Sequence, residues 1–415
     1  NTKQAISYGY TRWHHMFNAR QLLGLSLLGE AIRGISDTQV RETFLCLFSS
    51  ALEFNNLFTS FKGEGTGAVR HMFSHHVLKP ERMPLEANLW GTPRSSGSFS
   101  TLFERRILRA LEYCENPFEV RPVPGAGPRP TGEKVYGLSD PQSYEPAESF
   151  RAFRKGASVY LSCGDSARTD LLDEVVDAVV TDPPFFDNVH YSELADFFHV
   201  WQWHLTGAGQ ADTTRAPEEV QAREVDVFSS RLSGVWRECH RVLKRDGLLV
   251  FSYHHSRTEG WRAVLDSLVG AGFVIVQTHP IKAEMSGATP KRQAHEPIDL
   301  DILIVCRKRE AASVREQEDL LPAACTDAAA QLERLVRSGR PVSRGDVRIV
   351  LMAQVIRRLS RAATVGEALD AFDAIEPQAA ESVERLYGER LSERPKPRVV
   401  ESEPVQMGLA AAATD

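Results

Sequence analysis

Short apolar runs alternate with helical patterns in the middle of the chain, between residues 157 and 309. The segments between most of these runs carry apolar side chains at three- and four-residue spacing, which predicts amphipathic helices. Strands that alternate with helices indicate an α/β fold with a mainly parallel, doubly wound sheet. The last two runs follow each other without a helix, so we expect them to pair as an antiparallel hairpin at one edge of the sheet. The five runs are SVYLSCGD, DAVVTD, GLLVFSYHH, FVIVQTHPI and LDILIVCRK.

The predicted helices of this region are YSELADFFHVWQWHL, VFSSRLSGVWRECHRVLK and GWRAVLDSLVGAG. The first of them carries large apolar side chains at helical spacing, and we expect these side chains to pack against the sheet. They are Leu194, Phe197, Phe198, Trp201 and Leu205. The alternative is an aromatic surface that stacks on a ligand.

Helical patterns also dominate both ends of the chain. Near the N-terminus, the runs RQLLGLSLLGEAI and VRETFLCLFSSALEF repeat apolar residues every three or four positions. Prolines between residues 121 and 149 then interrupt regular structure. The predicted organisation is a helical N-terminal region (1–120), a Pro-rich linker (121–156), the α/β core (157–309), a helical C-terminal domain (310–392) and a disordered tail (393–415).

The composition is that of an ordinary globular protein, with 415 residues, 25% of them charged and 42% hydrophobic. The six cysteines are scattered without a CxxC pair, which argues against a zinc ribbon or a disulfide framework and fits a reducing cytoplasm. No apolar stretch is long enough to span a bilayer, so no membrane partner is expected. The first residue is Asn rather than Met, as expected of a fragment or a processed product.

A formal net charge of −6 does not indicate a general nucleic-acid binder, so contact with DNA requires a local basic surface. The segment 331–361 carries eight arginines against two acidic residues. Two interpretations stay open. Arg357, Arg358 and Arg361 contact a DNA backbone, because forked guanidinium groups suit phosphates, or the arginines form a solvated helical face.

The second apolar run leads into the stretch AVVTDPPFFDNVHYSEL (178–194). Two prolines after Asp182 forbid both helix and ladder, so the backbone there is held extended. In open α/β sheets, ligands bind at the carboxyl ends of strands. A carboxylate such as Asp182 and a carbonyl of the Asp-Pro-Pro turn can each accept one hydrogen of an exocyclic amine, which frees its lone pair for methyl transfer. Phe185 offers a face to a base flipped out of its helix. A strand edge stopped by proline is the structural alternative.

TDPPF resembles the Asp-Pro-Pro-aromatic motif of S-adenosylmethionine-dependent amino-methyltransferases, which act on adenine N6 or cytosine N4. The wider stretch VVTDPPFFDNVHYSELADFFHVW is similar to the large adenine-specific DNA methylases found with restriction and phage-defence systems. YGYTRWHHMFNARQLL, RVLKRDGLLVFSYHH and WRAVLDSLVGAGFVIVQTHPI look like further segments of those proteins, so the resemblance covers most of residues 8–306. It implies a Rossmann-like, class I methyltransferase core, with S-adenosylmethionine as cofactor and DNA as partner.

The resemblance also implies roles for individual residues. Those implied to hold the target amine and to stack on the base are Asp182, Pro183, Pro184 and Phe185. Those implied to bind the cofactor are Asp165, Gly164, Thr181 and Asp182. Those implied to contact the substrate are Phe185, Asn188, Tyr191 and His254. For Asp165 the alternative is a plain acidic residue between a strand and a turn, and for His254 and His255 it is simple capping of a strand end.

A glycine-rich loop normally follows the first strand in this family, and no clean match is present. VGAGF (269–273) follows a predicted helix and precedes a predicted strand, so we expect it to end that helix. KGEGTGAVRH (62–71) is the other candidate. We therefore expect an upstream fragment or a partner subunit to supply the loop. His71, His75 and His76 lack a supporting carboxylate or thiol, and no metal site is expected.

The predicted function is methylation of adenine N6 in DNA, with base flipping, in a restriction-modification or phage-defence system. Asp rather than Ser at the start of the motif favours adenine, on the basis of the resemblance. The alternatives are a cytosine-N4 DNA methyltransferase, an adenine-N6 RNA methyltransferase, and a non-catalytic nucleic-acid-binding subunit of a split methyltransferase.

Overall fold

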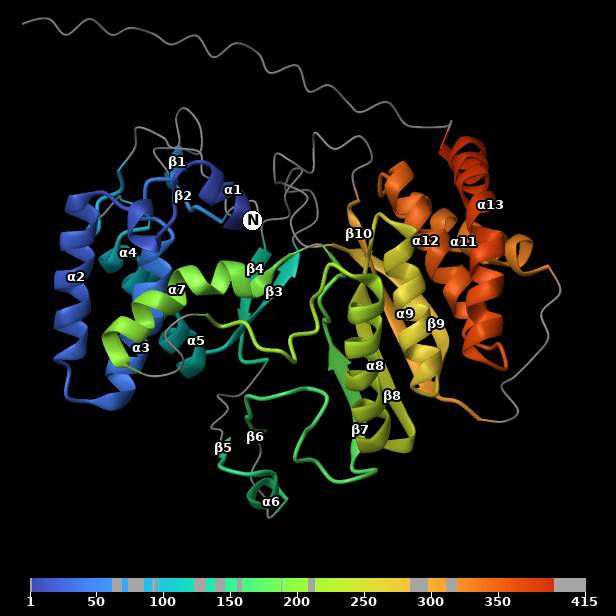
Figure 1. Cartoon of the computed structure of the whole chain (residues 1–415), viewed down its shortest axis with the longest axis horizontal. Coiled ribbons are helices and arrows are strands. Elements are labelled where there is room, and N and C mark those ends of the chain that lie inside the picture. The colour runs from blue at the N-terminus through green and yellow to red at the C-terminus, as the bar shows by residue number, and fades with distance from the viewer. Residues whose placement is uncertain are drawn as a thin grey trace, which may run out of the picture.

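The computed structural model describes residues 2–61, 69–73, 86–91, 95, 97–122, 132–138, 146–154, 159–187, 189–207, 213–283, 298–310 and 319–391. These residues form two hydrophobic cores, one among the N-terminal helices and one around a central sheet and the C-terminal helices (Figure 1). The predicted tail, 393–415, lies outside the described residues. None of the described helices is both long and apolar enough to cross a membrane.

The central sheet has four strands, in the order β7 (Val176–Thr181), β8 (Leu243–Tyr253), β10 (Leu300–Lys308) and β9 (Phe273–Lys282). β7 runs parallel to β8, whereas β10 runs antiparallel to both of its neighbours. The hairpin predicted for the last two runs is confirmed. The expectation of a mainly parallel sheet is wrong, because this hairpin reverses one inner strand and makes the small sheet mixed.

The first predicted strand, SVYLSCGD, is not part of the central sheet. Only Val159–Tyr160 (β6) form a ladder, and they pair with Pro146–Ala147 (β5) in a separate two-stranded sheet. Leu161 is 75% exposed. The polar residues that follow leave this run with too few apolar side chains to bury a strand of ordinary length. As a result, β7 is the outermost strand of the central sheet.

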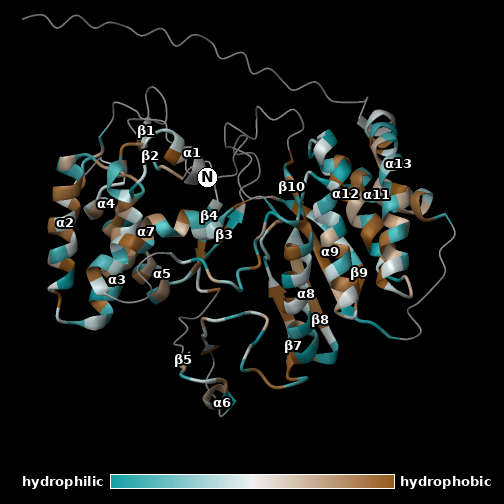
Figure 2. Cartoon of the chain, viewed as in Figure 1, coloured by the Kyte–Doolittle hydropathy of each residue, from teal (hydrophilic) through white to brown (hydrophobic). Residues whose placement is uncertain are grey.

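The helices of the C-terminal half are α8 (Val225–Val242), α9 (Thr258–Gly270), α11 (Leu320–Arg337), α12 (Arg344–Leu359) and α13 (Val365–Leu391). α8, α9 and α12 contact the strands on one face of the sheet, where Phe251 is fully buried. On the other face Val250 is half-buried and Val180 of β7 is 77% exposed. Figure 2 shows hydrophobic colour along β7 although this strand lies at the edge. The sheet therefore has one covered face and one open apolar face.

The N-terminal core is mainly helical. Its elements are α1 (Thr2–Ser7), the 3-10 helix η1 (Trp13–Met16), α2 (Ala19–Arg33), α3 (Thr38–Leu52), β1 (Ser60–Phe61), β2 (Val69–Arg70), α4 (Phe99–Leu102), the π-helix η2 (Phe103–Leu108) and α5 (Arg109–Glu115). After them, β3 (Phe118–Pro122) and β4 (Gly132–Tyr136) form a hairpin, and α6 (Phe150–Phe153) follows β5. Parts of the predicted Pro-rich linker thus have regular structure.

α7 (Tyr191–Thr206) belongs to the N-terminal core, although it follows shortly after β7. Phe197 stacks on Phe17, with ring centroids 5.6 Å apart. Gly29 of α2 lies so close to α7 that an added Cβ would come within 2.7 Å of Leu205. The prediction that α7 packs against the sheet is wrong. Two helices alone, α2 and α3, cannot enclose a core, and the apolar side of α7 packs against both of them.

The arginines of segment 331–361 make contacts inside the protein. Arg357 and Arg358 both bind the carboxylate of Asp327 at 2.5 Å. The others with a carbonyl or carboxylate partner are Arg334, Arg337, Arg340, Arg344 and Arg348. These contacts orient the guanidinium groups within the chain, and contact with a DNA backbone stays a prediction.

Candidate active site

The candidate site begins where β7 ends. Thr181 is the last residue of β7 and pairs with Phe251 of β8, which places Asp182 beside Ser252. The Ser252 hydroxyl donates a hydrogen bond to the Asp182 carboxylate. Asp182 is exposed, and Pro183 behind it is buried. A carboxylate is thus held at the carboxyl end of two parallel strands, where α/β sheets bind their ligands.

Two adjacent phenylalanines follow the prolines and enter different environments. Phe186 is buried and has a φ of 34°, which is rare for a bulky residue. Its ring packs on Phe228 at 5.4 Å and lies under the Arg257 guanidinium at 5.0 Å. This anchored turn leaves Phe185 half-buried, with its ring 4.8 Å from that of His254. Residues with a strained backbone, held in place by the packing around them, are frequent at active sites.

His254 is held in one orientation by Asp301. Its Nδ1 shares a hydrogen bond with the Asp301 carboxylate, and both side chains are largely buried. Since an ionised carboxylate only accepts, Nδ1 carries the proton and Nε2 is an acceptor in the neutral ring. The structure thus places the His254 ring next to Phe185. The hydrogen bond between His254 and Asp301 joins two neighbouring strands and does not cap a strand end.

Neither Asp301 nor Ser252 was predicted from the sequence. Ile302 of β10 pairs with Tyr253 of β8, so the residue before Ile302 meets the residue after Tyr253. The only signal was an acidic residue at the start of LDILIVCRK. That signal becomes informative once β10 is known to lie next to β8, which the order of the runs did not reveal.

His255 lies under the same turn and is buried. The ring of Phe186 is 5.6 Å from the ring of His255, and the Arg257 backbone N–H donates to its Nδ1 at 3.1 Å. Burial lowers the pKa of His255 below its ordinary value, and this effect outweighs the hydrogen bond with the Arg257 backbone, which acts in the opposite direction. The ring is therefore kept neutral beside the candidate site.

We expect the free energy of unfolding to fall as the pH drops below about 6.5, because the unfolded chain then binds a proton that buried His255 resists. One such group contributes a slope of at most about 1.4 kcal/mol per pH unit. His255→Asn keeps an acceptor near the Arg257 N–H and should flatten this slope, in urea unfolding between pH 5 and 8. Exposed His279, bonded to Gln277, supplies the control His279→Asn. Equal slopes for His255→Asn and the unaltered chain would contradict the assignment.

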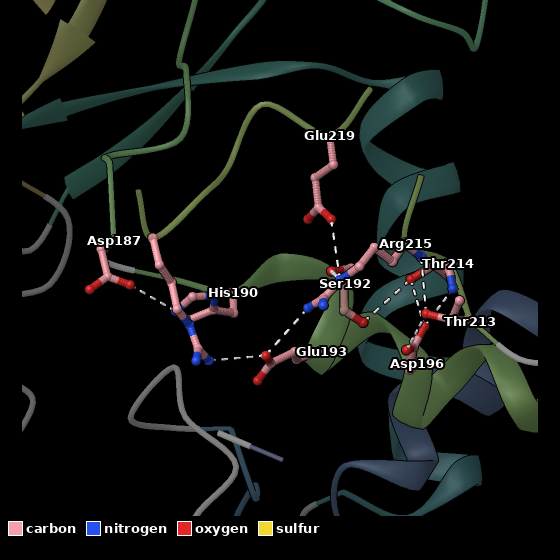
Figure 3. A network of polar contacts seen from close by, with 10 residues as sticks. Asp187, His190, Ser192, Glu193, Asp196, Thr213, Thr214, Arg215 and Glu219 are labelled. Carbon is pink, nitrogen blue, oxygen red and sulfur yellow. Dashed lines mark hydrogen bonds and ion pairs between the residues drawn. The ribbon is translucent and has the colours of Figure 1, made fainter. Parts of the chain in front are cut away.

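Ion pairs fix the first turns of α7 just after the motif (Figure 3). Glu193 is buried and pairs with Arg215 at 3.3 Å and with Arg223 at 3.4 Å. Asp196 accepts hydrogen bonds from the hydroxyls of Thr213 and Thr214 at 2.6 and 2.7 Å. The chain that leads to α8 is thereby tied to the start of α7, which fixes the far end of the motif loop.

The structure describes some of the predicted residues just after the motif and leaves others outside the described ranges. His190 lies 3.1 Å from the Asp187 carboxylate and bridges the loop (Figure 3). Tyr191 is the first residue of α7 and is exposed. Asn188 lies outside the described residues, as do His75 and His76.

The residues implied to bind the cofactor lie in two separate parts of the fold. Gly164 and Asp165 lie in coil after β6, outside the central sheet. The Asp165 carboxylate accepts the backbone N–H of Ala167 at 2.9 Å, so it caps its own turn. Thr181 alone lies next to Asp182 at the strand end.

The glycine-rich candidates do not complete the site either. Gly270 ends α9 and Gly272 has a φ of 83°, so VGAGF forms the helix end and turn that were predicted. Most of KGEGTGAVRH, residues 62–68, lies outside the described residues. Within the described ranges, the residues around Asp182 therefore do not fit S-adenosylmethionine on their own.

Comparison with known proteins identifies one family. Residues 176–337 match the model of a family described as DNA methylase, which covers methylation of adenine N6 and cytosine N4. The match starts with β7, contains TDPPF and the whole central sheet, and ends with α11. No curated protein matches the chain. The resemblance to DNA amino-methyltransferases is thus confirmed for this segment.

Proposed function

Because residues 176–337 match the model of the DNA methylase family, we propose that the protein methylates N6 of adenine in DNA with S-adenosylmethionine as methyl donor. The family is generally dependent on this cofactor. Methylation in restriction-modification or phage defence is the setting that the sequence resemblance suggests. The observation that carries the proposal is the placement of Asp182 at the carboxyl end of β7, on a turn stiffened by two prolines.

Asp182 addresses the main difficulty of the reaction. The lone pair of an exocyclic amine is delocalised into its ring, which makes the nitrogen a poor nucleophile. The Asp182 carboxylate and a carbonyl of the following turn each accept one amine hydrogen, which favours a tetrahedral nitrogen with its lone pair free. The hydrogen bond from Ser252 orients the carboxylate, and Asp182 is placed to receive the proton that the amine loses.

Phe185 and His254 suit a base presented to Asp182. Phe185 offers an aromatic face for stacking. His254, oriented by Asp301, has Nε2 free of that bond and able to accept from a base or to line its edge. Adenine is preferred over cytosine because the motif opens with Asp.

We propose further that a second segment or subunit supplies the cofactor half. The outer edge of β7 has no strand partner within the described residues, and Val180 beside it is 77% exposed. Parallel strands are ordinarily buried on both faces, and open edges accept further strands. A strand added parallel to β7 would end beside Asp182 and could present a glycine-rich loop there. This addition would complete a doubly wound, Rossmann-like core.

The same open edge favours one alternative function. On its own, the chain would be the base-binding, non-catalytic subunit of a split methyltransferase. In that case the isolated chain binds DNA without binding S-adenosylmethionine, and methylation appears only when the cofactor-bearing part is added.

Methyl transfer from labelled S-adenosylmethionine to matched DNA and RNA oligonucleotides tests the proposal. We expect N6-methyladenine in DNA, measured by mass spectrometry of the nucleosides, with the chain alone or with its cofactor-bearing partner. N4-methylcytosine would overturn the choice of base, and product in RNA alone would overturn the choice of nucleic acid. Absence of product from every substrate, with both parts present, would overturn the enzymatic proposal.

A further inference from the structure

A cavity of about 460 Å³ lies between β9, α11 and α12, at the edge of the sheet opposite to β7 (Figure 1). Part of its wall is polar. Gln331 of α11 donates to the Thr278 carbonyl of β9 at 2.6 Å, and Gln354 of α12 donates to the Thr278 hydroxyl at 2.8 Å. These bonds connect both helices to the strand, so the walls of the cavity are fixed by the fold. Its size is within the range of small-molecule sites.

Arg357 lies in the wall of the cavity, and two bonds fix its orientation. Its Nε donates to Gln354 Oε1 at 2.7 Å, and one of its Nη groups donates to the Asp327 carboxylate at 2.5 Å. Gln354 and Asp327 also line the cavity, which places the guanidinium group between two lining residues. The other Nη group has no partner in the described part of the chain. The Arg357 side chain is 21% exposed, so a ligand in the cavity can reach it.

Arg334 of α11 supplies a second guanidinium group to the same cavity. Its Nε donates to the Ala330 carbonyl, one turn earlier in the helix, at 3.2 Å, and both residues line the cavity. Arg334 is exposed, and neither of its Nη groups has a partner among the described residues. With two Nη groups from Arg334 and one from Arg357, the cavity offers three Nη groups that no described residue occupies.

The cavity carries an excess of positive charge. Among the described residues that line it, Asp327 is the acidic one. Its carboxylate already pairs with Arg357 and, outside the lining, with Arg358. With Arg334 included, three guanidinium charges accompany one carboxylate, in a chain whose formal net charge is −6. A local positive excess in an acidic protein favours an anionic ligand.

We propose that this cavity binds a phosphate group. A phosphate monoester has three terminal oxygens and a charge of about −1.5 to −2 at pH 7, and forked guanidinium donors pair with such oxygens through parallel bonds. A carboxylate offers only two oxygens and one charge. Val276, Pro280 and Leu335 line the rest of the cavity and suit the less polar part of a phosphorylated molecule. The phosphate belongs either to a small molecule or to a nucleic acid, and the proposal is independent of methylation at Asp182.

Calorimetric titration of the full chain tests this site. The probes are inorganic phosphate, ribose 5-phosphate and a short DNA duplex, with ribose and acetate as control ligands. We expect one site per chain for at least one phosphate-bearing probe, no binding of ribose, and weaker binding of acetate than of inorganic phosphate. Binding of ribose 5-phosphate identifies a small molecule as the source, whereas binding of the duplex alone identifies a nucleic acid.

Surface variants show whether that binding occurs in the cavity. Arg334→Gln removes two of the three Nη groups, and Ala330→Phe fills the cavity from an exposed helix position, so each should weaken binding about tenfold or more. The matched controls on the same helix are Arg337→Gln and Thr326→Phe, because both residues are exposed and neither lines the cavity. Arg334→Lys keeps the charge without the fork, so it should weaken binding less than Arg334→Gln does.

Any of three results would overturn the proposal. The first is the failure of every phosphate-bearing probe to bind. The second is binding that Arg334→Gln and Ala330→Phe leave unchanged, which places it elsewhere on the chain. The third is acetate binding as tight as that of inorganic phosphate. Both variants alter exposed side chains, so their melting temperatures should stay within a few degrees of that of the unaltered chain and the comparison remains valid.

Discussion

Replacing Asp182 with asparagine is expected to lower the turnover number for methyl transfer about 100-fold or more. Asparagine keeps a single acceptor oxygen, which the Ser252 hydroxyl would occupy, and it cannot take up the proton that the amine loses. Because Asp182 is exposed and its described partner is Ser252, stability should change little. Initial rates of methyl transfer to DNA, with the cofactor-bearing partner present if it is required, provide the measurement.

Asp177 provides a matched control for this substitution. It lies on the same strand, β7, its side chain is 83% exposed, and it pairs with Lys244. Asp177→Asn should keep nearly full activity. If the two variants lose activity equally, the effect comes from the charge of β7 and not from the chemistry of Asp182.

Replacing Asp346 with alanine is expected to lower the free energy of unfolding by about 3–5 kcal/mol. Asp346 is 1% exposed and belongs to the capping box at the start of α12. Its carboxylate accepts the backbone N–H groups of Asp299, Leu300 and Ser343 at 2.8, 3.0 and 2.9 Å. The substitution leaves these N–H groups unpaired and detaches the start of β10 from α12. Urea unfolding followed by circular dichroism measures the change.

Glu367 serves as the comparison, because it accepts the backbone N–H of Ala363 at the start of α13 but is exposed. Glu367→Ala should cost less than about 1 kcal/mol, since water replaces the lost bond. If Asp346→Ala also lowers the free energy of unfolding by less than about 1 kcal/mol, the buried carboxylate does not join α12 to the sheet.

The sequence predicted the parts of the site that depend on local chemistry. TDPPF lies at the end of a strand, as expected. The apolar run before it forms the strand and its own two prolines end the strand, and both effects are local in sequence. The hairpin of β9 and β10 and the three helices α7, α8 and α9 were also predictable from periodicity alone.

The parts that the sequence did not predict depend on contacts between distant segments. The contact of His254 with Asp301 depends on β10 lying next to β8. The apolar spacing of α7 predicted a buried face but not which core would bury it. The carboxylate of Asp327 binds Arg357 and Arg358 from another helix, which no local pattern reveals.

The position of α7 in the N-terminal core has a consequence for synthesis on the ribosome. Gln202 of α7 bonds to Ser49 of α3 across 153 positions of sequence. At about 5–20 residues per second, roughly 8–30 s pass between the emergence of α3 and that of α7. During this interval the apolar sides of α2 and α3 have no partner from α7. The sheet and the helices after it, by contrast, come from one later stretch of chain, so nascent N-terminal segments are the ones expected to need chaperones.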